Sequence, residues 1–186
     1  MKTTVGLVAM AMVLGITTNA RSDGPIPVRD VLIMMASVPS APGDPRSRPY
    51  RWDQVPGAGP IARAIAATAP DRLWAARMAV YAVHESALSA ECAVGDGKRS
   101  FGPWQLQGVA RSVACDPAAA APIWLERARH SLEDCSALPP HDRLAELTSG
   151  SCTRGRQLAR LREALVLGAL AKLDSIGSDG MVTGYE

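Results

Sequence analysis

The sequence predicts a single all-α domain. Beyond Pro60, alanine and leucine dominate, and no alternation of apolar and polar residues typical of a β-strand lasts more than a few positions. Prolines and capping residues recur at spacings that suit helix starts. With 186 residues, the chain is long enough to bury one proper core.

The first twenty residues are typical of a secretion signal. Lys2 supplies a short basic start, residues 5–16 are apolar, and Thr18 and Ala20 form a small-x-small pattern before Arg21. This apolar stretch is shorter than the roughly 20 residues that a membrane span requires. An uncleaved N-terminal anchor is the alternative. We expect a signal peptide at 1–20, a periplasmic or secreted protein, and no transmembrane segment after cleavage.

Residues 24–38 contain an apolar run that could form a small helix packed on the domain, and residues 39–60 are rich in Pro, Gly, Arg and Ser. We therefore divide the chain into a Pro-rich N-terminal arm or linker at 21–59, a domain at 60–175 and a flexible tail at 176–186. The expected helices of the domain span 60–68, 71–90, 103–113, 117–134, 140–149 and 153–174.

The net charge weakens the case for a nucleic-acid partner. The whole chain carries +2, and without Lys2 the balance is nineteen basic against eighteen acidic residues. A dedicated nucleic-acid binder usually has a strong basic excess. The arginines at 154, 156, 160 and 162 cluster early in the last expected helix, where we expect a solvated basic face. We expect a monomer.

Four cysteines follow the signal, and an even number in an exported chain favours two disulfides. They are Cys92, Cys115, Cys135 and Cys152. Three pairings are possible. We prefer Cys92–Cys115 with Cys135–Cys152, because both close short loops, each stabilising the fold by about 3 kcal/mol. A zinc site is a poor second choice without a CxxC pair, and no metal or cofactor is expected.

Glu85 is the most informative residue of the chain. The helix expected at 71–90 is apolar nearly all round, as is typical of a central helix, and Glu85 shares its large-residue face with Tyr81 and Met78. Burial of a lone carboxyl would raise its pKa, which is what a general acid requires. The alternative is a structural role, in which Glu85 caps a neighbouring helix or pairs with an arginine; candidate partners are Arg77, Arg111 and Arg127.

A Gly-rich loop follows this helix. It includes Gly95, Asp96, Gly97, Ser100, Phe101 and Gly102, and leads into Pro103-Trp104-Gln105. Glycines allow the backbone to approach a ligand closely, and proline rigidifies a turn. Trp104 offers an apolar plate, and Gln105 offers an amide that both donates and accepts hydrogen bonds. Sugars present weakly apolar faces rimmed by hydroxyls, so this pair suits a sugar ligand.

Three elements together make the sequence resemble the lysozyme-like lytic transglycosylases and goose-type lysozymes. These are Glu85-Ser86 at the end of a helix, Gly102-Pro103-Trp104-Gln105, and a later turn at Leu147-Thr148-Ser149-Gly150. The match covers residues 60–175. Leu147 stands where the family has a tyrosine, and Trp104 stands where it has a methionine. The resemblance implies a lysozyme-like fold with a central catalytic helix.

The resemblance also implies roles for particular residues. Glu85 would be the catalytic acid/base, Ser86 would hold the acetamide or the acid, and Asp96 would position water. Asp96 between two glycines equally suits a simple turn. The residues expected to bind substrate are Ser86, Asp96, Ser100, Gly102, Trp104, Gln105, Ser149 and Gly150.

The implied function is cleavage of peptidoglycan glycan strands at the MurNAc–GlcNAc bond. Glu85 would protonate the glycosidic oxygen, with assistance from the substrate acetamide. It would then take a proton from the sugar 6-hydroxyl, as a transglycosylase, or from water, as a lysozyme; the sequence leaves both open. Two other functions remain: a non-catalytic wall-binding or structural protein of lysozyme-like fold, and a disulfide-bonded helical interaction module without a sugar site.

Overall fold

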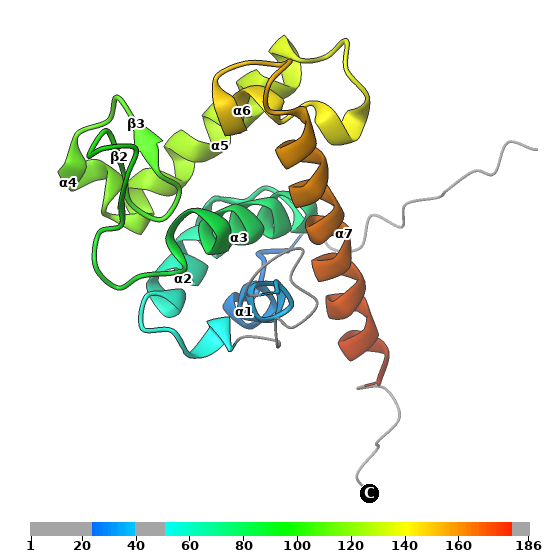
Figure 1. The fold of residues 1–186 in the computed structure, drawn as a ribbon. Helices are drawn as coiled ribbons and strands as arrows, with labels where there is room; N and C mark the ends of the chain where they lie inside the picture. The colour runs from blue at the N-terminus through cyan, green and yellow to red at the C-terminus, as the bar shows by residue number, and fades with distance from the viewer. Residues whose placement is uncertain (1–23, 40–50, 180–186) are drawn as a thin grey trace, which may run out of the picture.

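The protein is mostly helical and carries one small antiparallel sheet (Figure 1). The computed structural model describes residues 24–39 and 51–179. The signal peptide expected at 1–20 lies outside these ranges. The described α-helices are α1 (Val28–Ala36), α2 (Ala58–Thr68), α3 (Arg72–Ser86), α4 (Arg111–Ala114), α5 (Pro117–Asp134), α6 (Ala145–Ser149) and α7 (Arg156–Asp179). Two short 3₁₀ turns are η1 (Trp52–Gln54) and η2 (Pro140–Asp142).

Helix α3 is the centre of the fold, as its apolar sequence predicts. It packs against α1, α2, α5 and α7, and its residues from Met78 to Val83 are all buried. The Asp71 carboxylate caps its start by accepting a hydrogen bond from the Trp74 amide at 2.9 Å. The helix ends at Ser86 rather than at 90, because Ala87 turns into the left-handed conformation with φ 50°.

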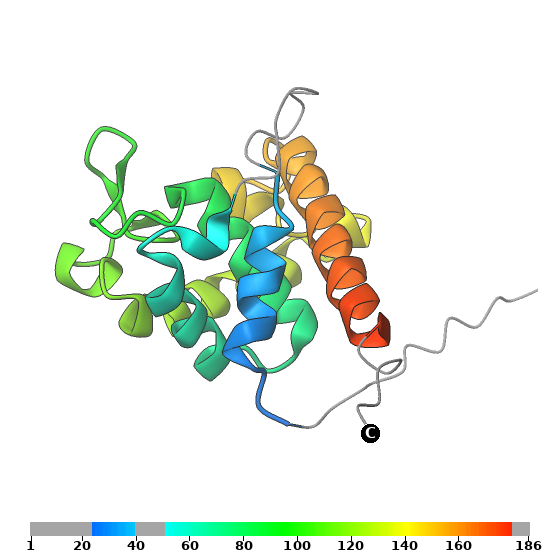
Figure 2. The same ribbon diagram turned by 90° about the horizontal axis from the view of Figure 1, so that it is seen from below.

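Helix α1 belongs to the folded domain, although it lies in the segment that we assigned to an arm or linker. Figure 2 shows it lying between α2 and α7, and Val31, Met34 and Met35 are fully buried. Trp52 in η1 is also buried, and its indole Nε1 donates to the Val38 carbonyl at 2.8 Å. The apolar run at 24–38 is therefore core, and the domain begins well before residue 60.

The segment expected to form a helix at 103–113 does not do so. Strands β1 (Val94–Gly95), β2 (Ser100–Phe101) and β3 (Leu106–Gln107) form a sheet in the order β1-β2-β3, and only residues 111–114 are helical. Gln105 takes φ 49°, a left-handed value that interrupts any helix there. The Trp104 indole also donates to the Met78 carbonyl of α3 at 2.9 Å, so tertiary contacts override the local propensity.

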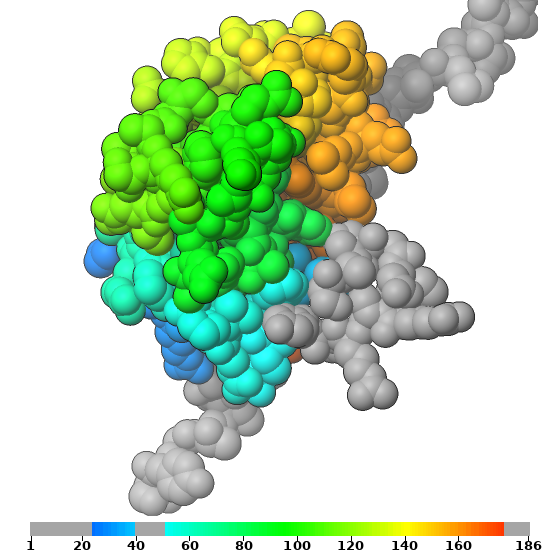
Figure 3. Space-filling view, turned by 60° about the vertical axis from the view of Figure 1, so that its left-hand side comes forward, coloured from blue at the N-terminus to red at the C-terminus, as the bar shows by residue number. Residues whose placement is uncertain are grey.

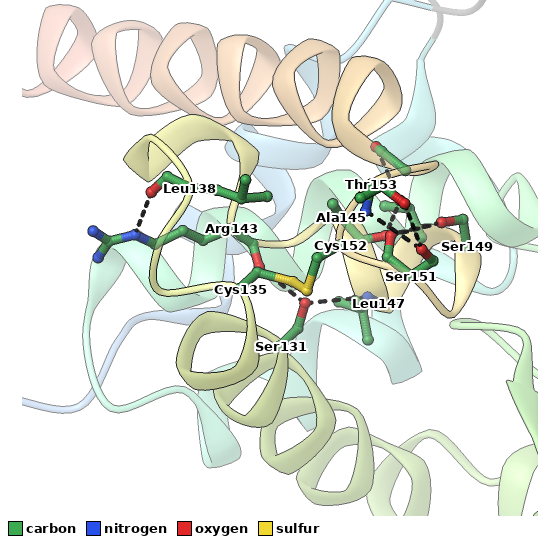
Figure 4. The surroundings of a disulfide bond; sticks show 12 residues. Ser131, Cys135, Leu138, Arg143, Ala145, Leu147, Ser149, Ser151, Cys152 and Thr153 are labelled. Carbon is green, nitrogen blue, oxygen red and sulfur yellow. Dashed lines mark hydrogen bonds between the residues drawn. A yellow bond between two sulfur atoms is a disulfide. The ribbon is translucent and has the colours of Figure 1, made fainter.

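Both preferred disulfides are present. Cys92 joins Cys115 with a Cα–Cα distance of 5.1 Å, and Cys135 joins Cys152 at 5.4 Å. Figure 4 shows the second bond, which ties the end of α5 to the loop after α6. Beside it, the Ser131 hydroxyl donates to the Arg143 carbonyl and accepts from the Leu147 amide. The expected helix at 140–149 is accordingly split into η2 and α6.

Helix α7 continues to Asp179, beyond the expected end at residue 174, and residues 180–186 lie outside the described ranges. Of the arginines near its start, Arg154, Arg156 and Arg160 are exposed, as expected of a solvated basic face, whereas Arg162 is buried. Arg156 and Arg160 both bind the fully buried carboxylate of Asp142. Among the described residues, no helix is long and apolar enough to cross a membrane.

Candidate functional site

A cleft of about 600 Å³ opens between the small sheet and α6, with α3 and α5 contributing the remaining walls. Figure 3 shows a face on which the sheet segment (green) lies between the start of α5 (yellow-green) and the chain around α6 (yellow to orange). Six residues singled out from the sequence line this cleft. They are Glu85, Asp96, Trp104, Gln105, Ser149 and Gly150.

Three other expected binding residues do not line the cleft. The Ser86 hydroxyl donates to the Ala82 carbonyl and accepts from the Leu88 amide, so it helps to end α3. Ser100 is fully buried behind the sheet turn. Gly102 has φ 80°, and a Cβ there would run into the Ala114 carbonyl, so it serves close packing against α4.

Glu85 is not the isolated buried carboxyl that the helix pattern suggested. Its side chain is 27% exposed, and its Oε1 lies 2.6 Å from Nη2 of Arg162 on α7. None of the three arginines considered from the sequence is the partner. Arg162 is not among the residues that line the cleft, so Glu85 lies between the cleft and a buried guanidinium. The carboxylate compensates the charge of this buried guanidinium.

Two other α3 side chains face Arg162. The Arg162 Cζ lies 4.6 Å from the centroid of the Tyr81 ring, within the range of a cation–π contact. Burial raises the pKa of the Tyr81 hydroxyl, which therefore stays protonated. Burial, and then the charge of Arg162, lower the pKa of His84 to about 4. His84 is therefore neutral near pH 7, and Arg162 is the cation of this cluster.

The turn of the Gly-rich loop is held by a small polar network. Asp96 adopts φ 48°, and its Oδ2 accepts hydrogen bonds from Ser100 Oγ at 3.2 Å and Gln107 Nε2 at 2.8 Å. Ser100 Oγ also lies 2.9 Å from Gln105 Oε1. A Cβ on Gly95 would collide with the Gln105 amide, so glycine is required for this approach. Both readings of Asp96 fit: it shapes the turn and it lines the cleft.

Trp104 contributes mainly to the core beneath the cleft. It is 4% exposed, so it does not offer the open apolar plate that the sequence suggested. Its ring centroid lies 6.4 Å from that of Trp124, which in turn lies 5.2 Å from Tyr81 in an edge-to-face arrangement. All three rings line the cleft and form an apolar part of its wall.

Several charged residues of the cleft were not assigned to the site from the sequence. Arg99, Arg127, His130 and Glu146 all line it. Burial first, and then the charge of Asp134, raise the pKa of Glu146. Glu146 Oε2 is buried without a hydrogen-bond partner among the described residues. The sequence did offer one signal for Glu146: it directly precedes Leu147, the first residue of the third element of the resemblance.

The cleft offers little to a metal ion. In the described part of the chain, the potential ligands that cluster are Glu146, Cys135 and Cys152. Both cysteines are in a disulfide, so they have no thiolate to offer. The cleft presents the carboxylates of Glu85, Asp96 and Glu146 together with amide, hydroxyl and guanidinium groups. That set suits binding of a polar ligand and proton transfer.

Comparison of the chain with protein-family models, curated proteins and solved structures finds no match.

Proposed function

We propose that this protein is a peptidoglycan-cleaving glycosidase that acts on the MurNAc–GlcNAc bond with Glu85 as general acid/base. The supporting observation is the convergence of three separate sequence elements on one open cleft. Glu85 from α3, Gln105 from the sheet segment and Ser149-Gly150 after α6 all line it. Two disulfides support the expected export to the periplasm or the outside of the cell.

The chemistry needs only one carboxyl group in two protonation states. A protonated Glu85 would give its proton to the glycosidic oxygen as the C1–O bond breaks, and the bonding electron pair would go to that oxygen. The substrate acetamide would stabilise the positive charge that develops at C1. The Glu85 carboxylate would then take a proton from the attacking hydroxyl. The attacking group is the sugar 6-hydroxyl in a transglycosylase and a water molecule in a lysozyme.

The test is release of soluble muropeptides from purified peptidoglycan. Glu85→Gln keeps the size of the side chain but cannot give or take the proton, so activity should fall by at least about 10²-fold. Glu126→Gln is the matched control, because Glu126 is an exposed α5 carboxylate outside the cleft lining. Full activity of Glu85→Gln would exclude the mechanism. Mass spectrometry of the products separates the two outcomes, since anhydro ends indicate a transglycosylase and reducing ends a lysozyme.

A non-catalytic wall-binding or structural protein is the second candidate. The observation that favours it is the Glu85–Arg162 ion pair. Pairing with an arginine is what a purely structural role of Glu85 predicts, because a poorly hydrated carboxylate needs a partner for its charge. This candidate predicts that the protein sediments with peptidoglycan but releases no muropeptides, and that Glu85→Gln leaves the binding unchanged.

A further inference from the structure

Arg162 is a buried cation that contacts Glu85 through one end of its guanidinium. Its side chain is only 7% exposed, and Nη2 forms the ion pair with Oε1 of Glu85. Its Nε and Nη1 atoms are buried and have no hydrogen-bond partner in the described part of the chain. Burying an arginine is costly unless its charge is compensated, so the Glu85 carboxylate is the group that makes this placement tolerable.

The ion pair anchors Glu85 from the side of α7. Its Oε1 is held by Arg162, and the residue lines the open cleft. A free glutamate side chain samples several rotamers. Without an anchor, part of the free energy of substrate binding would be used to order the side chain. Anchoring Oε1 by Arg162 therefore restricts the orientation of Glu85 at the cleft.

Among the described residues, Glu85 is the carboxylate that pairs with Arg162. On α3, Tyr81 is uncharged and His84 is neutral near pH 7. The neighbouring carboxylate of α7, Glu163, is engaged by Arg77 through hydrogen bonds of 2.8–3.2 Å. The described acidic groups on the other elements packed against α7 are Asp30 on α1, paired with Arg72; Asp142 on η2, paired with Arg156 and Arg160; and Glu146 on α6.

We propose that Arg162 is a positioning residue, which orients the Glu85 carboxylate at the cleft. This inference rests on the proposed glycosidase function and extends it. Arg162 itself touches no substrate. Its effect passes through Glu85, so loss of Arg162 should reduce turnover more than substrate binding.

The test compares Arg162→Met with Arg77→Met on soluble glycan strands at 25 °C. Both variants remove an arginine from a buried α3–α7 ion pair, but only Arg162 contacts Glu85. After correction for the folded fraction, Arg162→Met should lower kcat by about 10²-fold, because misplacement of a catalytic group by about 1 Å costs this much. KM should change by less than about threefold, since ground-state contacts are retained. Arg77→Met should retain kcat.

Rescue by the conservative variant adds a readout that a purely structural role would not move. Arg162→Lys keeps a positive charge next to Glu85, so it should recover about tenfold of the lost kcat and leave KM unchanged.

Each outcome decides the proposal. Equal kcat in Arg162→Met and Arg77→Met would overturn the positioning role while leaving the glycosidase function intact. If Arg162→Met does not fold, Arg162→Lys carries the test, and wild-type kcat in that variant would overturn the proposal. A wild-type protein that releases no muropeptides would refute the glycosidase function, and the role of Arg162 in it would fall with it.

Discussion

The ion pair between Arg77 and Glu163 provides the sharpest test of how α3 and α7 are held together. Arg77 Nη2 donates to Glu163 Oε2 at 2.8 Å, and Nε donates to both carboxylate oxygens at 3.0 and 3.2 Å. The two side chains are 12% and 11% exposed. A pair buried to this extent has lost most of its hydration. Removal of one partner therefore leaves the other as an unpaired charge in the interface.

For Arg77→Met we expect the free energy of unfolding to fall by about 3 kcal/mol, the low end of the range for breaking a buried pair. For a chain of this size, each kcal/mol shifts Tm by about 2–4 °C, so Tm should fall by about 6–12 °C. Urea unfolding followed by far-UV circular dichroism measures the first quantity, and a thermal scan measures the second.

The double variant Arg77→Met/Glu163→Leu separates the charge effect from lost packing. Arg77 Cζ also lies 5.0 Å from the centroid of Trp74, and both variants lose that contact. Because an apolar replacement for a buried ion pair is often neutral, the double variant should lie within about 1 kcal/mol of the wild type. A loss below about 1 kcal/mol in the single variant would mean that the pair behaves like an exposed one, and the reasoning would fail.

Two further predictions concern the region around α6. Asp142→Asn should destabilise the protein at neutral pH, because hydrogen bonds from Arg160 and Arg156 lower the pKa of Asp142. A depressed carboxyl pKa stabilises the fold above the unfolded value of about 3.9. The difference from wild type should therefore shrink as the pH falls from about 5 toward 2; a constant difference in urea titrations across that range would contradict this. Removing the Cys135–Cys152 bond as Cys135→Ser/Cys152→Ser frees a loop with a sequence separation of 17 and should cost about 3 kcal/mol of unfolding free energy, so a loss below about 1 kcal/mol would count against it.

Local sequence signals predicted the central helix and both disulfides correctly. Asp71 marks the start of α3, and Asp116 with Pro117 marks the start of α5; the Asp116 carboxylate accepts from the Ala118 amide at 3.0 Å. These signals act within one turn of the chain, so they can be read from the sequence alone. Short loops between cysteines likewise favoured the pairing that the structure has.

The same reasoning failed where distant segments decide the conformation. Within residues 103–113 the one helix-breaking residue after Pro103 is Gly108, which has φ 66°, yet the helix is already absent before it, where Leu106 and Gln107 pair with β2. The left-handed Gln105 is held by hydrogen bonds of its amide group with Ser100 and the Gly102 carbonyl. None of these contacts has a periodic signature in the sequence. A propensity estimate therefore extends the wrong element through the sheet.

The partner of Glu85 could not be read from the sequence for a related reason. The chain offers many arginines, and Arg162 lies in a cluster whose neighbours Arg156 and Arg160 serve Asp142 instead. Only the packing of α7 against α3 selects Arg162. The sequence thus identified Glu85 as an unusual carboxylate in an apolar helix. It did not identify Arg162 as the group that pairs with it.

The charges at this interface also fix how the two helices meet. Helix α3 carries Arg77 and Glu85, and α7 carries adjacent residues of opposite sign, Arg162 and Glu163; the observed pairs are Arg77 with Glu163 and Glu85 with Arg162. Exchanging the partners would place Arg77 beside Arg162 and Glu85 beside Glu163, with like charges in a poorly hydrated interface. That arrangement is strongly unfavourable, so the two pairs discriminate against it even if each adds little net stability. The same register brings a buried cation behind Glu85 and leaves its carboxylate at the cleft. The α3–α7 contact therefore depends on both ion pairs, whereas only the Glu85–Arg162 pair reaches the candidate active site.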